Sequence, residues 1–219
     1  SLHEMRKVVN KLLKDKFIDF NTEVHIEYAR GLNDANMRKA IADYQRGQDK
    51  KHQNYEKSIK DLYFQETGKN IDPTETDIRK FELWEEQSHK CLYTGAEIGI
   101  ADFLGDNPKY DIEHTIPRSI GGDSIMENLT LCDSRYNRDV KKAKMPSELA
   151  NHEEILTRIE GWKKNYESLT YQIDKCRTHA GMSKEQKDPI IQKRHRLKIE
   201  RNYWKDKYER FTMTEAPGD

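Results

Sequence analysis

The sequence predicts a mostly helical α+β fold, in which a small ββα module is flanked by long helices. Through most of the chain, apolar residues recur at the three- and four-residue spacing that is typical of amphipathic helices. Between Cys91 and Leu131 the pattern changes to short apolar runs with five glycines and two prolines. Such a stretch favours turns and short strands. We therefore place the compact module in the middle of the chain.

The composition limits the class of protein. Charged residues make up 36% of the chain, hydrophobic residues only 34%, and the mean hydropathy is −1.07. These values favour elongated helices over one thick core. No window approaches the roughly 20 apolar residues of a membrane span, and the N-terminus has no apolar signal core. Three widely spaced cysteines argue against a disulfide framework. We expect a soluble, intracellular protein of a reducing cytoplasm.

The helices and strands before the module are predicted in order from their apolar spacing. Residues 1–16 suit a helix, residues 17–28 read as extended, and residues 29–62 read as mostly helical. Residues 67–70 then close the helix, and Asp72-Pro73 starts a turn. The helix that follows carries Ile78, Phe81 and Trp84.

After the module, apolar residues recur at alternating four- and three-residue spacing, which is typical of two helices packed side by side. Residues 178–189 break this pattern, and a last helix carries Leu197, Trp204 and Phe211. The chain should therefore end in a helical hairpin. The residues of the apolar seam are Ile155, Ile159, Trp162, Tyr166, Leu169, Ile173 and Cys176.

The residues that carry chemistry lie in three short blocks. Tyr-Asp-Ile-Glu-His-Thr-Ile-Pro-Arg-Ser occupies 110–119, Asn-Leu-Thr-Leu-Cys occupies 128–132, and Arg-Tyr-Asn-Arg occupies 135–138. A carboxylate directly before a histidine, then Asn-Leu, then an asparagine before a basic run, resembles the signature of the HNH nucleases. The order and the spacing together make this a specific signal. The resemblance implies a ββα-metal core at about 91–145, with His114 leaving one strand and Asn137 opening the helix.

Phosphodiester hydrolysis needs an activated water and a cation that neutralises charge on the phosphate. His114 suits the first task, because a neutral imidazole titrates near physiological pH. Glu113 and the Asn137 amide oxygen suit Mg²⁺, for which Mn²⁺ can substitute. Asn128 then ties down the loop that aims His114. Asp111 is a rival ligand because it lies on the same side of a strand as Glu113.

The cysteines depart from the pattern of many HNH modules, which hold a structural zinc with two Cys-x-x-Cys pairs. Thr94 and Arg135 stand where the second cysteine of each pair would be. Cys91 and Cys132 alone do not make a tetrahedral site, so we predict no structural zinc and assign both residues to the core.

The overall charge gives no basic footprint for nucleic acid, because Lys plus Arg and Asp plus Glu are both 39. Residues 135–144 are locally basic, with five basic residues against one acidic. We expect Arg138, Lys141 and Lys142 in this run to contact DNA phosphates.

The resemblance is closer to one family, the type II CRISPR-associated RNA-guided DNA endonucleases in their compact type II-C form. It extends over nearly the whole chain. The residues that carry it are Cys-Leu-Tyr-Thr-Gly at 91–95, the blocks at 111–119 and 144–148, the RuvC-like segments at 2–6 and 24–30, and a linker at 203–211.

The family implies a location in the prokaryotic cytoplasm, a division of the chain and a set of partners. Glu27 would be one metal ligand of a separate RuvC site that is incomplete here. The HNH module would cut the DNA strand paired with guide RNA, alongside the RuvC and recognition lobes of the effector. The implied parts are an orphan RuvC segment (1–30), a helical lead-in (31–88), the HNH core (89–150), a helical hairpin with return linker (151–212) and a frayed tail (213–219).

Two alternatives remain open. A stand-alone homing or restriction nuclease has to capture duplex DNA unaided, and its usual net positive charge is missing here. A non-enzymatic helical module that binds nucleic acid would not need Glu113, His114, Asn128 and Asn137 together. We also expect Val24 to Tyr28 to form a strand that lacks sheet partners within this chain.

Overall fold

The computed structural model describes residues 2–19, 22 and 34–215, and it divides the chain into two units, residues 1–33 and 34–219. In the first unit, helix α1 (Leu2–Lys14) confirms the helix predicted over residues 1–16. The predicted strand at Val24 to Tyr28, with the predicted RuvC ligand Glu27, lies outside the described residues. The second unit holds the predicted catalytic residues.

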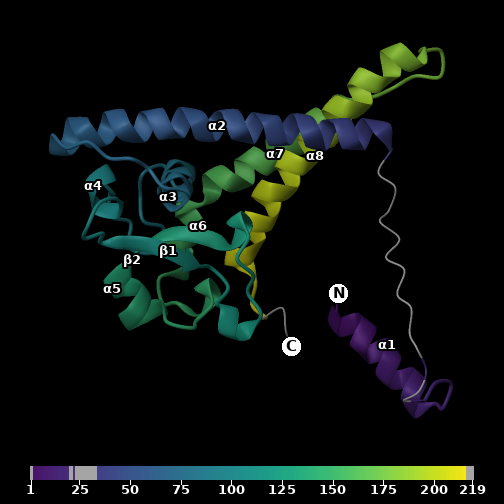
Figure 1. Cartoon of the computed structure of the whole chain (residues 1–219), viewed down its shortest axis with the longest axis horizontal. Helices are drawn as coiled ribbons and strands as arrows, with labels where there is room; N and C mark the ends of the chain where they lie inside the picture. The colour runs from purple at the N-terminus through teal and green to yellow at the C-terminus, as the bar shows by residue number, and fades with distance from the viewer. Residues whose placement is uncertain (1, 20–21, 23–33, 216–219) are drawn as a thin grey trace. The chain divides into compact units, whose positions relative to one another are not determined.

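Helix α2 (Ala35–Thr67) agrees with the predicted helix over the described residues, ends at the closure predicted for residues 67–70, and continues across Gly47. Its start is fixed by Asp34, whose carboxylate accepts a hydrogen bond from the Met37 amide at 2.8 Å. Its end is fixed by Gly68 at φ +70°, a conformation in which glycine carries no steric cost. Within the second unit, α2 lies along one side, and helices α3 (Glu75–Glu86) and α4 (Ile100–Phe103) lie between it and the strands (Figure 1).

Helix α3 (Glu75–Glu86) begins with a reciprocal cap between Thr74 and Asp77 and confirms the helix predicted after Asp72-Pro73. Its buried residues Phe81, Leu83 and Trp84 belong to the main apolar core, which Phe103 of the short helix α4 (Ile100–Phe103) also enters. This core lies under the sheet and supports the candidate active site.

The sheet has two antiparallel strands, β1 (Tyr110–His114) and β2 (Leu129–Asp133), with His114 paired to Leu129. His114 therefore ends its strand, as predicted. The helical segment after β2 begins earlier than predicted, because Asp133 caps the amides of Arg135 and Tyr136 and starts α5 (Ser134–Tyr136). Asn137 instead begins a π-helical turn, η3 (Asn137–Lys141). The short 3-10 turns are η1 (Arg118–Ile120), η2 (Met126–Asn128) and η4 (Pro146–Glu148).

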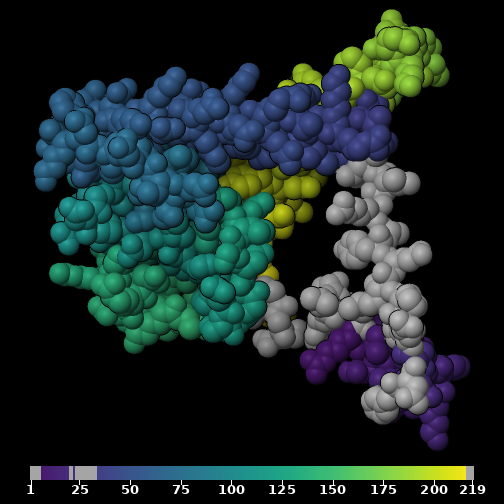
Figure 2. Space-filling view, viewed as in Figure 1, coloured from purple at the N-terminus to yellow at the C-terminus, as the bar shows by residue number. Residues whose placement is uncertain are grey.

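The C-terminal part contains α6 (His152–Arg158), α7 (Glu160–Lys175) and α8 (Lys184–Thr212), and α7 packs on α8 as the predicted hairpin. Pro189 was expected to lie in the break between these helices but lies inside α8. It stands near the start of the helix, where losing one backbone hydrogen bond does not prevent the helix from forming. The turn between α7 and α8 projects past the N-terminal end of α2 (Figure 2).

The second unit is a helix-rich α+β fold, which confirms the predicted class. The core joins α2, α3, both strands and the ends of α7 and α8 through residues such as Ile59, Leu131, Trp162 and Phe211. None of the helices in the described parts of the chain combines the length and the apolar character that a bilayer crossing requires.

Candidate active site

The ends of β1 and η3 border an open cleft of about 230 Å³. Glu113, His114 and Asn137 all line it, so the structure brings three of the predicted site residues together. The remaining lining residues are Ile112, Pro117, Arg118 and Lys142. The cleft opens to solvent, and a polymeric substrate could therefore reach the histidine without a channel.

His114 is half-buried and stands at the end of β1. Its Nε2 atom lies 2.9 Å from the Oγ atom of Ser124, which belongs to the loop between the strands. The backbone just after His114 is fixed as well, because the Thr115 amide donates to the Asn128 carbonyl at 2.8 Å. The imidazole is thus oriented from its strand and from this loop.

Asn128 is fully buried, and its side chain connects two backbone segments of the loop between the strands. Its Oδ1 atom accepts a hydrogen bond from the Ile116 amide at 2.8 Å. Its Nδ2 atom donates to the carbonyls of Ile116 and Asp123 at 3.0 and 2.7 Å. Asn128 does not line the cleft. It can act on the chemistry only by shaping the loop that carries Ser124.

Glu113 is only 3% exposed, and protein groups already hold its carboxylate. Its Oε2 atom accepts hydrogen bonds from the hydroxyls of Tyr93 at 2.7 Å and Thr130 at 2.9 Å. Its Oε1 atom is in direct contact with the ammonium group of Lys141. Burial, followed by the negative charge of Glu113, raises the pKa of Tyr93 well above its ordinary value, so this hydroxyl remains a hydrogen-bond donor.

Lys141 corrects one prediction. Its side chain is 1% exposed, so in this structure its ammonium is not available to a DNA phosphate. Besides the Glu113 contact, its Nζ atom donates to the His114 carbonyl at 2.9 Å. The π-helical turn, closed by a hydrogen bond from the Lys142 amide to the Asn137 carbonyl, directs Lys141 inward. Arg138 and Lys142 are exposed.

The two other predicted oxygen ligands differ in position. Asn137 is half-buried and lines the cleft. Asp111 is not among the lining residues. Its Oδ2 atom accepts a hydrogen bond from Ser134 at 2.6 Å, and its Oδ1 atom lies 3.7 Å from the Lys80 ammonium. The lining of the cleft therefore favours Asn137 with Glu113 over Asp111 as the oxygen donors that share the cleft with His114.

Sequence reasoning missed Ser124, Arg118 and Tyr93 as residues of the site. Two of them lay within the blocks that carried the resemblance, Arg118 in Ile-Pro-Arg-Ser and Tyr93 in Cys-Leu-Tyr-Thr-Gly. Their place within these blocks was the available signal. Ser124 carried no such signal, because its contact with His114 depends on how the loop folds back.

The cysteine pair lies apart from the cleft. Cys91 and Cys132 are both fully buried and both belong to the main core. A hydrogen-bond contact between the two thiols raises the pKa of Cys132, and burial raises it further, which favours a protonated thiol. Among the described residues, no group of three or more histidine, cysteine, aspartate or glutamate side chains is placed to hold a metal ion.

Comparison with known proteins places this site in a family context. Residues 91–147 match the family model of the HNH endonucleases. The CRISPR-associated endonuclease Cas9 1 of Streptococcus thermophilus is 30% identical over 146 residues, which cover 64% of this chain. The match covers 12% of that relative, so the chain spans about one eighth of its length.

Solved structures share the fold. A crystal structure of Streptococcus thermophilus Cas9 in complex with the AGAA PAM superposes with a TM-score of 0.53 at 20% identity, over 88% of this chain and 19% of that one. The type II-C Cas9 of Actinomyces naeslundii gives 0.52 at 19% identity, over 97% of this chain and 19% of that one. The chain therefore carries an HNH endonuclease domain, at residues 91–147, and is related to the Cas9 endonucleases.

Proposed function

We propose that this chain supplies the target-strand nuclease of an RNA-guided CRISPR effector, in which it hydrolyses DNA phosphodiester bonds with one divalent metal ion. The observation that supports this most directly is the presence of Glu113, His114 and Asn137 around one solvent-open cleft. A histidine base next to two oxygen donors is what metal-assisted hydrolysis requires.

His114 is the general base in this proposal. Its Nε2 atom takes a proton from a water molecule, whose oxygen attacks the phosphorus as the bond to the 3′ oxygen breaks. Ser124 lies 2.9 Å from the same nitrogen and therefore has to share or release it when the water binds. The half-buried imidazole can reach a substrate at the cleft without moving its strand.

The residues of the cleft fit a hard cation. Glu113 and Asn137 offer oxygen atoms, which Mg²⁺ and Mn²⁺ prefer as ligands. The Glu113 carboxylate and the His114 carbonyl already converge on one positive charge, the Lys141 ammonium. This corner thus stabilises a cation. A bound metal ion would supply neutralisation of the phosphate charge, with Glu113 and Asn137 as the residues that hold it.

Exposed basic residues surround the cleft and suit phosphate contacts. Arg118 and Lys142 line it, and Arg138 is exposed on the same turn as Asn137. The chain as a whole has a formal net charge of zero. Such a chain binds DNA weakly by itself, which suits a nuclease that other parts of an effector supply with DNA. We propose those parts, the guide RNA and the paired target strand as its partners.

The proposal is tested in the complete effector that contains this chain, by single-turnover cleavage of each DNA strand with guide RNA and Mg²⁺. His114→Ala should slow target-strand cleavage by about 10²- to 10⁴-fold, the usual contribution of positioned proton transfer. The matched control is His179→Ala, because His179 is an exposed histidine in the turn between α7 and α8. Wild-type cleavage of the target strand by His114→Ala would refute the assignment.

A second variant separates metal binding from proton transfer in the same assay. Asn137→Ala should lose target-strand cleavage comparably, and raised Mg²⁺ or added Mn²⁺ should restore part of it, since the defect is in metal affinity. His114→Ala should gain nothing from added metal. Equal metal rescue of both variants would contradict the assigned roles.

A further inference from the structure

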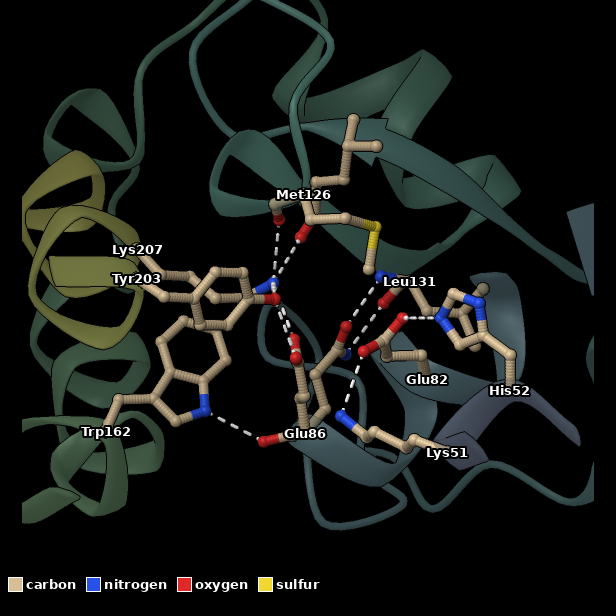
Figure 3. A network of polar contacts seen from close by, with 11 residues as sticks. Lys51, His52, Glu82, Glu86, Met126, Leu131, Trp162, Tyr203 and Lys207 are labelled. Atoms are coloured by element: carbon tan, nitrogen blue, oxygen red, sulfur yellow. Dashed lines mark hydrogen bonds and ion pairs between the residues drawn. The ribbon is translucent and has the colours of Figure 1, made fainter. Parts of the chain in front are cut away.

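A buried lysine lies behind the loop that connects the two strands. Lys207 of α8 is 0% exposed, and its Nζ atom donates to the carbonyls of Met126 at 2.9 Å and Leu129 at 3.1 Å. The same atom lies 2.7 Å from Oε2 of Glu86, at the end of α3. Figure 3 shows this ammonium between the loop backbone and the glutamate.

An acidic side chain and two aromatic rings surround the Lys207 side chain and fix its position. Glu86 is buried with it and also accepts a hydrogen bond from the Tyr203 hydroxyl at 2.6 Å. The ammonium lies 5.4 Å from the ring centre of Trp162 and 5.5 Å from that of Tyr203, distances at which aromatic rings attract a cation. A desolvated ion pair of this kind costs free energy to bury, so packing alone is a weak reason to have one.

The two carbonyls that Lys207 contacts lie where the loop ends and β2 begins, close to the residues that orient His114. They flank Asn128, and Leu129 is the residue paired with His114 across the sheet. One turn further along α8, Arg210 lies 3.3 Å from the carboxylate of Asp123, next to Ser124. Helix α8 therefore holds the loop on both sides of the segment that contacts His114.

We propose that Lys207 is a positioning residue of the nuclease: it fixes residues 115–128 against α8 and thereby sets the orientation of His114. The inference rests on the proposed function of His114 and adds that helix α8 helps to position this catalytic residue. Lys207 acts through the loop and touches neither substrate nor metal.

The test has to separate positioning from simple stability. Lys207→Met alone leaves the Glu86 carboxylate buried without a cationic partner, which is strongly destabilising. The double variant Lys207→Met with Glu86→Gln removes both charges and keeps an acceptor for the Tyr203 hydroxyl. Replacing a whole buried pair by neutral side chains is often tolerated. The matched control is Lys205→Met, on the same helix, whose partly exposed ammonium lies 3.5 Å from Glu209.

Hydrogen exchange of this chain gives a readout that does not depend on activity. In the double variant, the amides of Thr115, Ile116 and Gly122 should exchange at least about tenfold faster than in the wild type, because they report the closed loop. The α7 and α3 amides should keep their protection. Unchanged exchange at the loop amides in a folded double variant would overturn the proposal.

Cleavage in the complete effector gives the functional arm. The double variant should slow single-turnover cleavage of the target strand by about tenfold with little change in DNA affinity, whereas Lys205→Met should behave as wild type. Faster loop exchange with wild-type cleavage would overturn the positioning role. Cleavage that is insensitive to His114→Ala would instead overturn the proposed function, so the two failures are distinguishable.

Wild-type protein supplies a second test if the double variant does not fold. Exchange measured at increasing low concentrations of denaturant identifies which amides open together. The loop amides at 115, 116 and 122 should share one opening with the end of α8, at residues 204–211. Loop amides that open independently of α8 would refute the coupling.

Discussion

Two buried lysines, Lys141 and Lys207, contact opposite ends of the loop at residues 115–128, and their surroundings differ. Lys141 and Lys207 each contact one carboxylate and at least one backbone carbonyl, and both are almost completely buried. Lys141 contacts Glu113, which lines the cleft, and Lys207 contacts Glu86, which does not. The first ammonium lies beside a carboxylate that we propose as a metal ligand, and the second lies behind the loop.

The difference shows that two equally buried lysine charges can have different effects on the domain, depending on which carboxylate each one contacts. The partners of Lys207 lie away from the cleft. Replacing Lys207 and Glu86 by neutral side chains should therefore mainly loosen the loop. At Lys141 the same ammonium also balances a carboxylate that we propose as a metal ligand. Removing that ammonium should therefore change how the domain responds to metal, whereas removing Lys207 should not.

The largest expected effect is at Lys141. Lys141→Met leaves Glu113 buried without its cation and should lower the free energy of unfolding by about 3–5 kcal/mol. Because a cation that binds only the folded state stabilises it, added Mg²⁺ should raise the melting temperature of this variant more than that of the wild type. Thermal unfolding against Mg²⁺ concentration measures both quantities.

The comparison fails if Lys141→Met and wild type respond equally to Mg²⁺. Adding Glu113→Gln to Lys141→Met should recover stability and abolish the additional metal response, since no bare carboxylate remains. Lys142→Met, at the exposed neighbouring position, is the control and should leave the melting temperature unchanged.

An intermediate effect is expected at Gly122, in the loop that connects β1 to β2. A Cβ atom on this residue would overlap the carbonyl oxygen of Ile116, so Gly122→Ala should displace the loop and cost about 1–3 kcal/mol. The matched control is Gly161→Ala in α7, where nothing lies within 4 Å of the added atom. It should stabilise the helix by about 0.5–1 kcal/mol. Urea unfolding of both variants checks the signs, and a neutral Gly122→Ala would show that the loop shifts freely.

The smallest effect is expected at Lys142, which is exposed at the cleft, next in sequence to the buried Lys141. Lys142→Ala should reduce the salt dependence of DNA binding by the effector by about one charge, with little change in single-turnover rate. Lys184→Ala, at the exposed start of α8, should change neither. A rate loss as large as that of His114→Ala would mean that Lys142 belongs to the chemistry rather than to phosphate binding.

The sequence predicted what depends on short-range pattern. The α3 helix and the α7–α8 hairpin follow from apolar spacing and turn residues, and the strand that ends at His114 follows from the motif and its resemblance to HNH nucleases. The grouping of Glu113, His114 and Asn137 in one cleft follows from motif order.

What the sequence did not predict depends on long-range contacts. Lys141 looked like a solvated residue of a basic helix, because an α-helical count does not anticipate a π-helical turn. The role of Lys207 needs carbonyls that lie about 80 residues away in the chain, at Met126 and Leu129. The contact between Ser124 and His114 depends on the closed loop, in which Asn128 bonds the Asp123 carbonyl.

The π-helical turn at Asn137–Lys141 has a consequence for how this domain is compared with its relatives. Such a turn holds one residue more than an α-helical turn and is the form that a single inserted residue takes inside a helix. A relative with an ordinary helical turn would carry its inward lysine one position earlier. Alignment by residue count would then pair that lysine with Val140 and assign the wrong residue to the buried contact with Glu113. Deleting one residue from 138–140 should convert one geometry into the other.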